Sequence, residues 1–363
     1  MRELSLYIHV PFCTRRCSYC SFYHVQSETS RERAFVDALL SEIDAALGEL
    51  APVALRTIFV GGGTPTVLAR SEWERIITAL QPYIRGGLDE FTVEMNPEDV
   101  DAGLARFLRG LGVNRASLGI QSMHAVGQKV LKRCDPATNR RAIDVVMGEW
   151  DNVSFDVLLG VPKTARADLV ETLRMLLGKG PKHLSVYGLE AGGDMAGEVE
   201  RFFRAVDPDR VADEYLDTCR LLAGAGFDHY EVSNFARPGF ESRHNRAYWD
   251  GREYLGVGPA AHSMVGGRRF LNEPSLDAYA SRRGFEHIAA RIYDDGGDHQ
   301  LEAAMLALRT NQGIARDQCD ATVLEEFVGE GLATVHDDRV RLTDRGYLVL
   351  NDIVLKLLSV TPC

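Results

Sequence analysis

Apolar residues in the first half of the chain follow two alternating patterns. Short apolar runs typical of strands are separated by longer segments in which apolar residues recur every four positions, as at Phe35, Leu39 and Ile43, which is typical of an amphipathic helix. The predicted strands cover residues 4–10, 55–60, 90–94, 114–120, 153–159 and 182–187, and the predicted helices cover residues 30–50, 73–84, 104–111, 139–150 and 169–177. Strands joined by helical crossovers predict an α/β fold with parallel strands.

Glycine and polar residues concentrate at or just after the C-terminal ends of these strands. A Gly-Gly-Gly-Thr-Pro run at 61–65 follows the second strand, Gln121 ends the fourth, and a Gly-Val-Pro run at 160–162 follows the fifth. Barrel enzymes gather their chemistry on this rim, so the pattern favours a barrel over a doubly wound sheet. Because there are six repeats and not eight, we predict a partial (β/α)6 barrel.

The second half of the chain has a different organisation. A loop over 192–208, a helix over 209–225 and a strand over 227–232 precede an irregular, aromatic-rich stretch over 234–264, whose composition suits a functional loop. Later, helices over 301–308 and 319–328, a hairpin over 332–342 and a helix over 343–358, capped by Thr343, outline a winged helix. We therefore predict a barrel over residues 1–225, an extension over 226–290 and a winged-helix-like domain over 291–363.

Composition and charge narrow the class of protein. The 363 residues are 45% hydrophobic and 26% charged, as is ordinary for a globular protein, and the net charge of −11 argues against nucleic acid as a partner. The winged-helix region is acidic as well, so we expect it to pack or interact and not to read DNA. No apolar stretch is long enough to span a bilayer, and no signal-like segment precedes the first strand, so we expect a cytoplasmic protein.

Three cysteines with the spacing C-x3-C-x2-C follow the first strand at Cys13, Cys17 and Cys20. Zinc normally takes four protein ligands, whereas three thiolates suit a [4Fe–4S] cluster with one iron open to another ligand. A structural zinc or free thiols remain the alternative. S-adenosylmethionine is a suitable ligand for an open iron, and one-electron transfer then gives radical chemistry. The remaining cysteines are scattered and are interpreted as buried or incidental thiols: Cys134, Cys219, Cys319 and Cys363.

Two further features fit this chemistry. The glycines at 61–63 let the backbone approach a small zwitterion, although a tight structural turn explains them equally well. Glu94 and Asp156 are strand-end carboxylates suited to ribose hydroxyls or an ammonium group, and each taken alone is as easily an ordinary surface acid.

Five motifs together resemble one protein family. They are Y-I-H-V-P-F-C-x3-C-x2-C from Tyr7, V-G-G-G-T-P-T from Val60, E-M-N-P-E from Glu94, S-L-G-I-Q-S from Ser117 and D-V-L-L-G-V-P from Asp156. This set resembles the radical S-adenosylmethionine proteins that include oxygen-independent coproporphyrinogen III oxidases and HemW-type heme chaperones. The resemblance covers nearly the whole chain.

The resemblance implies roles for particular residues. Cys13, Cys17 and Cys20 would hold the [4Fe–4S] cluster of a six-repeat partial barrel. The primary S-adenosylmethionine site would be lined by Tyr7, Gly62 and Glu94, with His262 as a further candidate. Positions that surround a second such molecule in the oxidases correspond to Tyr19, Gly63, Thr64, Gln121, Arg133, Asp156 and Gly188.

Three features favour the chaperone branch of this family. Phe22 stands where the oxidases typically have a fourth cysteine. The chain begins a few residues before its first strand, whereas the oxidases carry a long N-terminal extension. The run His244-Asn-Arg-Ala-Tyr248-Trp249 matches the H-N-x-x-Y-W signature associated with the chaperones. In contrast, residues 191–195 depart from the family's usual E-x-G-T loop.

His244 is the candidate axial ligand of heme, with Tyr248 and Trp249 covering the porphyrin. The alternative is that these residues pin a loop to the barrel. His9, His229 and His262 are rival ligands.

The resulting hypothesis is a heme-binding protein that delivers heme to an acceptor protein and carries a [4Fe–4S] cluster and S-adenosylmethionine. If radical chemistry occurs, an electron donor such as flavodoxin or ferredoxin is implied, and a peripheral contact with a membrane-bound acceptor is part of the hypothesis. The alternatives are oxidative decarboxylation of coproporphyrinogen III and another radical transformation of a tetrapyrrole.

Overall fold

A single curved sheet forms the centre of the computed structural model, which describes residues 1–189, 201–202, 204–294, 296–297 and 299–358. The six predicted strands are present and pair in parallel in the order β1-β4-β5-β6-β7-β8. Their bounds are β1 Arg2–Val10, β4 Val53–Gly62, β5 Glu90–Met95, β6 Arg115–Gln121, β7 Val153–Leu159 and β8 His183–Gly188. The sheet does not close on itself among the described strands, so the partial α/β barrel is confirmed.

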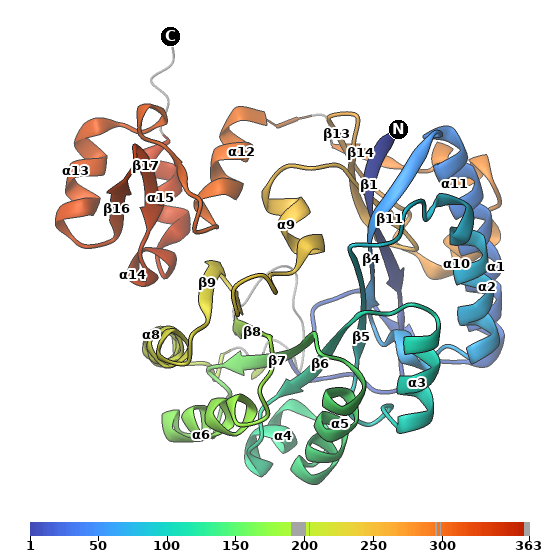
Figure 1. Cartoon of the computed structure of the whole chain (residues 1–363), viewed down its shortest axis with the longest axis horizontal. Coiled ribbons are helices and arrows are strands. Elements are labelled where there is room, and N and C mark those ends of the chain that lie inside the picture. Colours follow the sequence, from blue (N-terminus) through green and yellow to red (C-terminus); the bar gives the residue numbers. More distant parts are fainter. Residues whose placement is uncertain (190–200, 203, 295, 298, 359–363) are drawn as a thin grey trace.

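Helices cover the convex face of the sheet (Figure 1). They are α1 Thr29–Glu49, α2 Arg70–Leu80, α3 Ala102–Gly110, α4 Ala125–Leu131, α5 Pro136–Glu149, α6 Arg166–Leu177 and α8 Pro208–Gly224. Aspartates cap several of them, because a carboxylate accepts hydrogen bonds from the free N–H groups of a first turn. Asp101 caps α3, Asp135 caps α5 and Asp207 caps α8. The short helix α4 was not predicted.

The two faces of the sheet have different chemistry. On β1, Leu6, Ile8 and Val10 are fully buried in the core shared with the helices. Since successive side chains of a strand point to opposite faces, the intervening residues reach the concave side. There Tyr7 contacts the ring of Phe59 and donates or accepts a hydrogen bond with His9. The concave side is therefore lined largely by polar and aromatic groups, which is where a polar ligand can be held.

The prediction of an irregular stretch over 234–264 is wrong. This stretch contains β10 Asn234–Ala236, α9 Arg243–Trp249, β11 Tyr254–Val257 and the start of β12 His262–Val265. β11 adds a seventh parallel strand beside β1, with Tyr7 opposite Gly256. These elements are three to seven residues long, too short to show a period, and are held by partners distant in the sequence.

Antiparallel strands complete both edges of the sheet. β12 pairs with β13 Arg268–Leu271, which pairs with β14 Ile292–Asp294. At the other edge β10 lies between β8 and β9 Asp228–Glu231. Two short helices, α10 Leu276–Ser281 and α11 Phe285–Ala289, pack on α1.

The C-terminal region has the predicted winged-helix-like outline, contacts α8 and α9, and lies away from α1 to α5 (Figure 1). Its elements are α12 His299–Leu308, β15 Ile314–Ala315, α13 Ala321–Gly329, β16 Ala333–His336, β17 Arg339–Leu342, α14 Asp344–Tyr347 and α15 Leu350–Leu357. The hairpin turns at Asp337 and Asp338, both with positive φ, and Thr343 caps α14 as predicted. The predicted single helix over 343–358 is two helices.

The described residues leave two predictions untested. Most of the loop predicted over 192–208, and all of the family departure at 191–195, lie outside the described residues. The division of the chain at residues 225 and 290 also stays a prediction. Among the described helices, none has the length and apolar character that crossing a membrane requires.

Candidate functional site

A cavity of 370 Å³ opens at the C-terminal rim of the parallel strands. Its walls come from the cysteine loop and from the ends of β4, β5, β6, β7 and β8. The sequence-predicted residues that line it are Cys13, Cys17, Tyr19, Cys20, Gly62, Gly63, Thr64, Glu94, Gln121, Arg133, Asp156 and Gly188. Residues separated by up to 175 positions are thus brought to one place, as expected because parallel strands of a barrel place their C-terminal ends on one rim.

The cysteine loop is fixed to the barrel at both ends. Cys13 lies in the short strand β2 Phe12–Cys13, which pairs with β3 Val25–Gln26. The Thr64 hydroxyl donates to Cys13 Sγ at 3.6 Å, and Arg133 Nη1 donates to Cys17 Sγ at 3.6 Å. Donors aimed at sulfur stabilise thiolates, so these contacts favour the form of cysteine that binds metal. Without a cation, burial raises the pKa of the Cys13 thiol to about 11.

At two positions of the glycine run, steric crowding requires a residue without a side chain. Gly62 has φ of 108°, and a Cβ there would lie 2.6 Å from the His9 ring. At Gly63 a Cβ would lie 2.5 Å from the carbonyl oxygen of Phe12. Side chains are therefore excluded where β4 meets the cysteine loop, and the N–H groups of Gly63 and Thr64 bond to the carbonyls of Val10 and Phe12 at 2.7 and 2.6 Å.

Two carboxylates face the cavity from neighbouring strand ends. Glu94 accepts a hydrogen bond from Gly62 N–H at 3.1 Å, and Asp156 accepts one from the Ser117 hydroxyl at 3.3 Å. Burial, with the charge of Asp156 added, raises the pKa of Glu94 to about 8. Burial raises the pKa of Asp156 to about 6. Two acids held close together in this way attract a cationic or hydrogen-bond-donating ligand.

Unpaired polar atoms lie on the other side of the cavity. Gln121, at φ of 65°, has a buried Oε1 with no hydrogen-bond partner among the described residues. Arg133 uses Nη1 on Cys17 and Nη2 on the Gly119 carbonyl at 2.5 Å, and its buried Nε has no such partner. Leaving a buried polar atom unpaired costs about 1–3 kcal/mol, which a polar ligand would recover.

Comparisons with known proteins cover the part of the chain that forms this cavity. The radical SAM superfamily model matches residues 7–176. The heme chaperone HemW of Mycobacterium tuberculosis is 32% identical over 376 residues, which cover 99% of this chain and 95% of that protein. The chain belongs to the HemW family. The heme chaperone HemW of Bacillus subtilis is 30% identical and covers 96% of this chain and 97% of its own length.

The solved structures agree on the fold of this HemW-family protein. Coproporphyrinogen III oxidase (HemN) from Escherichia coli superposes with a TM-score of 0.82 over 98% of this chain and 89% of that chain. Its sequence identity is 21%, so the likeness concerns the fold. Membership of the radical SAM superfamily implies a [4Fe–4S] cluster and S-adenosylmethionine.

The spacing of the loop thiols fits a cluster better than a single ion. Among the described residues, three metal-ligating atoms all within 4.8 Å of one another occur at Cys219, His229 and Asp344 and not at the three loop cysteines. A tetrahedral zinc would draw its thiolates to about 3.8 Å from one another. A cluster attaches each thiolate to a different iron and so accepts wider spacing.

His244, the proposed heme ligand, is not at the cavity. It is 1% exposed in α9, which lies on the concave side of the sheet (Figure 1). Its Nδ1 pairs with the Thr57 hydroxyl and its Nε2 with the Tyr248 hydroxyl, both at 2.8 Å. Burial, with a contribution from Arg115, lowers its pKa to about 3. Both nitrogens have partners, so the geometry supports the alternative that this segment is pinned to the barrel.

The rival histidines also differ in whether their ring nitrogens have hydrogen-bond partners. His9 is buried with its nitrogens on Tyr7 and the Tyr23 carbonyl, and His229 contacts Tyr215 and Asp344. His262 is exposed at the start of β12, and neither of its ring nitrogens hydrogen-bonds to another described residue. It lies beside Gly256, whose added Cβ would meet the His262 carbonyl.

The lining residues that were missed from the sequence as individuals include Asn96, Tyr187 and Arg15. Asn96 follows β5 and donates to the Thr64 hydroxyl at 2.7 Å, Tyr187 lies near the end of β8, and Arg15 is in the cysteine loop. Asn96 and Tyr187 follow the same strand-end rule as the residues that were found, so that rule, applied evenly, would have identified them.

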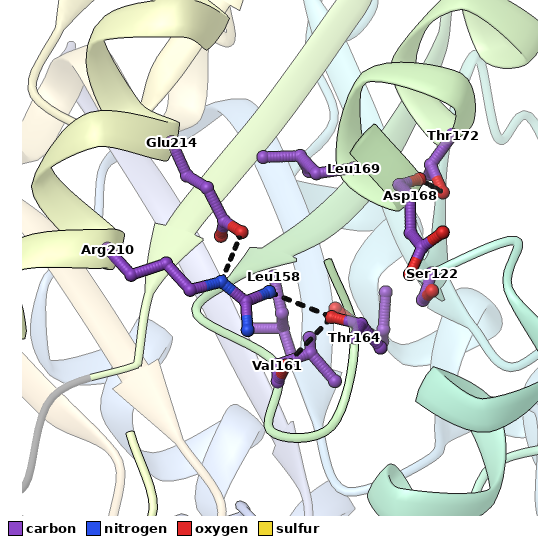
Figure 2. Close-up of a pocket in the computed structure, with 10 residues that line it drawn as sticks. Ser122, Leu158, Val161, Thr164, Asp168, Leu169, Thr172, Arg210 and Glu214 are labelled. Carbon is purple, nitrogen blue, oxygen red and sulfur yellow. Dashed lines mark hydrogen bonds and ion pairs between the residues drawn. The ribbon is translucent and has the colours of Figure 1, made fainter. Parts of the chain in front are cut away.

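A second, enclosed space below this rim is too small for a ligand. It measures 10 Å³, about one water, and lies between α6, α8 and the end of β7 (Figure 2). Three of its polar residues bond to one another: Arg210 donates to Glu214 at 2.8 Å and to the Thr164 hydroxyl at 2.9 Å. Glu214 also accepts from Gly160 N–H at 2.6 Å. This group holds α8 against the strand end and is structural.

Proposed function

We propose that the protein binds heme and delivers it to an acceptor protein, on a scaffold that carries a [4Fe–4S] cluster and S-adenosylmethionine. The observation that carries the proposal is the full-length relationship to proteins named heme chaperones, at 32% and 30% identity. A membrane-bound acceptor and an electron donor such as flavodoxin or ferredoxin remain part of the proposal. A cytoplasmic location is also proposed, because the seven cysteines need not pair in a reducing compartment.

In this proposal Cys13, Cys17 and Cys20 hold the cluster. S-adenosylmethionine, when bound to the open iron, supplies one-electron chemistry at its sulfonium. This chain's own groups select that ligand: Gly62 and Gly63 leave room for it, and Glu94 and Asp156 offer carboxylates for its ammonium and hydroxyl groups. Tyr7 lies on β1 opposite Phe59 of β4, three residues before Gly62, and its hydroxyl hydrogen-bonds to His9; it is not among the described residues that line the cavity.

We propose that the far side of the cavity takes a second polar ligand. Tyr19, Gly63, Thr64, Gln121, Arg133, Asp156 and Gly188 line this side. The unpaired Gln121 Oε1 and Arg133 Nε support the proposal, because both atoms are buried and face no partner among the described residues. A second S-adenosylmethionine, which has donors and acceptors for both atoms, would satisfy them.

For the heme ligand we propose His262 in preference to His244. β12 pairs Met264 with Tyr254 on β11, and Tyr254 packs on Tyr248 at the concave face. His262 is two residues from Met264 and so points to the same face, near Tyr7. Burial, with Arg269 nearby, lowers the pKa of His262, which keeps the imidazole neutral as an iron ligand requires. Phe22, 70% exposed at the cavity mouth, offers an apolar contact for a porphyrin.

Heme titration of single-histidine variants tests this assignment. We expect His262→Ala to weaken heme binding at least tenfold and to shift the Soret band. His244→Ala should leave the Soret position unchanged while lowering the thermal midpoint, because two buried hydrogen bonds are lost. His336→Ala, on the exposed hairpin, is the matched control. Loss of the Soret shift in His244→Ala alone would return the ligand role to His244.

Enzymatic activity is tested separately. The cluster-loaded protein is incubated anaerobically with coproporphyrinogen III, S-adenosylmethionine and a reductant. The chaperone proposal expects no protoporphyrinogen. Formation of that product at a catalytic rate would establish the oxidase alternative instead.

A further inference from the structure

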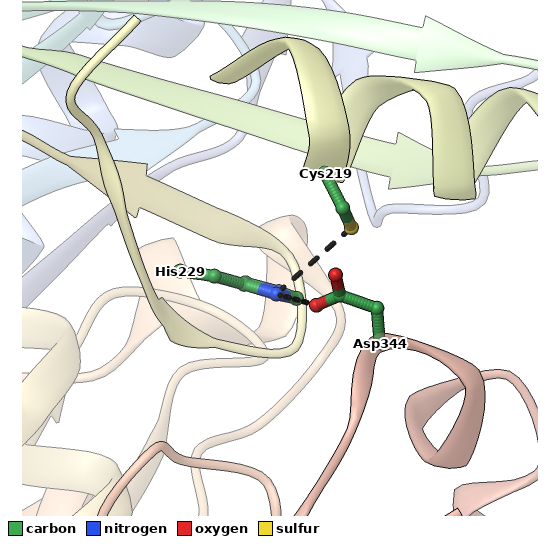
Figure 3. A group of neighbouring side chains, drawn as sticks. All are labelled: Cys219, His229 and Asp344. Carbon is green, nitrogen blue, oxygen red and sulfur yellow. Dashed lines mark hydrogen bonds and ion pairs between the residues drawn. The ribbon is translucent and has the colours of Figure 1, made fainter. Parts of the chain in front are cut away.

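Cys219, His229 and Asp344 meet away from the cavity (Figure 3). Cys219 comes from α8, His229 from β9 and Asp344 from α14, so the group joins the barrel side of the molecule to the C-terminal region. Cys219 is 3% exposed, and the side chains of His229 and Asp344 are 14% and 46% exposed. From the sequence, Cys219 was interpreted as an incidental buried thiol, because its two neighbours lie 10 and 125 positions away.

The Asp344 carboxylate and the Cys219 sulfur both lie next to the same nitrogen of the His229 ring, Nδ1. His229 Nδ1 lies 2.9 Å from Asp344 Oδ1 and 4.0 Å from Cys219 Sγ, and all three atoms lie within 4.8 Å of one another. In a Cys-His-Asp catalytic arrangement the nucleophile and the acid contact opposite nitrogens of the ring. The shared nitrogen is therefore the geometry of three ligands around one point, and not that of a nucleophile and its base.

The opposite nitrogen fixes the tautomer. The Tyr215 hydroxyl donates to the Val232 carbonyl at 2.9 Å, so it can only accept from His229 Nε2, 3.2 Å away. The Val232 carbonyl, 3.4 Å from Nε2, is also an acceptor. Nε2 therefore carries the proton, and in the neutral ring Nδ1 presents a lone pair to the Asp344 carboxylate. Metal-bound histidines are held in the same way, by a donor bond from the second nitrogen to a carbonyl or other acceptor.

A lone pair facing a carboxylate at 2.9 Å needs a cation between or beside them. The alternative is a second proton on the ring, which makes an ion pair with Asp344 while the Cys219 thiol donates to the same carboxylate. A divalent metal satisfies all three atoms. Tetrahedral zinc with thiolate, imidazole and carboxylate ligands places them about 3.3–3.6 Å apart, within about 0.7 Å of the separations that Nδ1 makes here.

We propose that Cys219, His229 and Asp344 form a second metal site that binds Zn²⁺ and fastens the C-terminal region to the barrel. One thiolate, one imidazole and one carboxylate form a donor set typical of zinc. A pocket of 390 Å³ lined by His229, Asp344, Arg341 and Tyr347 reaches the site and gives a water or a small anion access to the fourth position. The site is distinct from the cysteine loop and uses none of its residues.

Zinc alone is the probe, added to protein whose [4Fe–4S] cluster has been reconstituted and whose iron content is checked. After desalting we expect about one zinc per chain. X-ray absorption at the zinc edge, which does not detect the cluster iron, should show one sulfur at about 2.3 Å and nitrogen or oxygen at about 2.0–2.1 Å. A zinc shell without sulfur would overturn the proposal, as would failure to retain zinc at micromolar concentration.

Variants separate this site from the cluster. Cys219→Ser and Asp344→Asn should each weaken zinc binding at least tenfold while leaving the iron content and the secondary structure unchanged. Asp344 is half-exposed, so Asp344→Asn tests the site even if Cys219→Ser folds poorly. Cys319→Ser, a half-buried thiol of the C-terminal region, is the matched control and should bind zinc normally. Equal zinc affinity in all four proteins would show that the three residues form only an ion pair beside a thiol.

Discussion

Two glutamates on one strand show how differently the two ends of this barrel are built. Glu90 begins β5, is 3% exposed and is surrounded by donors: the Ser242 hydroxyl at 3.0 Å and the N–H groups of Arg243 and His244 at 2.7 and 3.3 Å. Glu94, four residues later, has the Gly62 N–H and the nearby charge of Asp156. At the base, the Glu90 carboxylate accepts several hydrogen bonds and holds α9 in place. At the rim, the Glu94 carboxylate has few protein donors and can still bind a ligand.

This difference between the two carboxylates indicates that the base of the barrel serves stability and the rim serves binding. The base is closed by α9, whose His244 bridges Thr57 and Tyr248. The rim keeps unpaired buried atoms on Gln121 and Arg133 that face the cavity, whereas the unpaired Nε1 of Trp249 and Nε of Arg115 belong to the base and do not line it. Changes at the rim should therefore affect cofactors, and changes at the base should affect folding.

The largest expected effect is at the rim. Cys17→Ser should abolish the cluster, because two thiolates cannot hold a [4Fe–4S] unit with an open iron. Iron and sulfide content and the visible absorbance of the reconstituted protein are the measurements. Cys319→Ser, outside the loop, should keep full iron content. Retention of most of the iron in Cys17→Ser would mean that the loop is not the iron site.

A change at the base should leave the cofactor and reduce stability. Glu90→Ala removes the acceptor of two backbone N–H groups and one hydroxyl at the start of α9, and we expect a cost of about 3 kcal/mol. This should appear as a lowered thermal midpoint in differential scanning fluorimetry with normal iron content. Glu171→Ala, an exposed glutamate on α6, should change the midpoint little. If Glu90→Ala lost iron without losing stability, the division between base and rim would fail.

The smallest of these effects depends on pH. The pKa of Glu94 is raised to about 8 in the folded protein, from about 4.5 when unfolded. The folded state therefore binds more protons than the unfolded state between these values, so stability is lost as pH rises from 4.5 to 8. Because Glu94 lines an open cavity, we expect about 2 kcal/mol of this loss to disappear in Glu94→Gln. Thermal midpoints at pH 5 and pH 8.5 measure it, with Glu171→Gln as control; equal pH dependence in Glu94→Gln and the parent protein would contradict it.

The sequence predicted the rim better than the base, for physical reasons. Each of the six strands is an apolar run followed by glycine or a polar residue, and parallel strands bring such ends together. β11 has four residues, Tyr254–Val257, with a glycine among them, and shows no period. α9 is mostly polar and is held by Glu90, about 150 positions earlier. The motif around His244 identified the family, but residue types alone do not show that both ring nitrogens are already bonded.

The pairing of β1 with β11 cannot form until β11 has been synthesised. Residues 2–10 leave the ribosome some 240 positions before residues 254–257 that complete their outer edge. At synthesis rates of about 5–20 residues per second, that interval is roughly 12–50 s. For that time one side of β1 is an unpaired edge of the kind that adds foreign strands. The three closely spaced thiols emerge directly after β1, so they follow a strand whose outer edge stays unpaired throughout that interval.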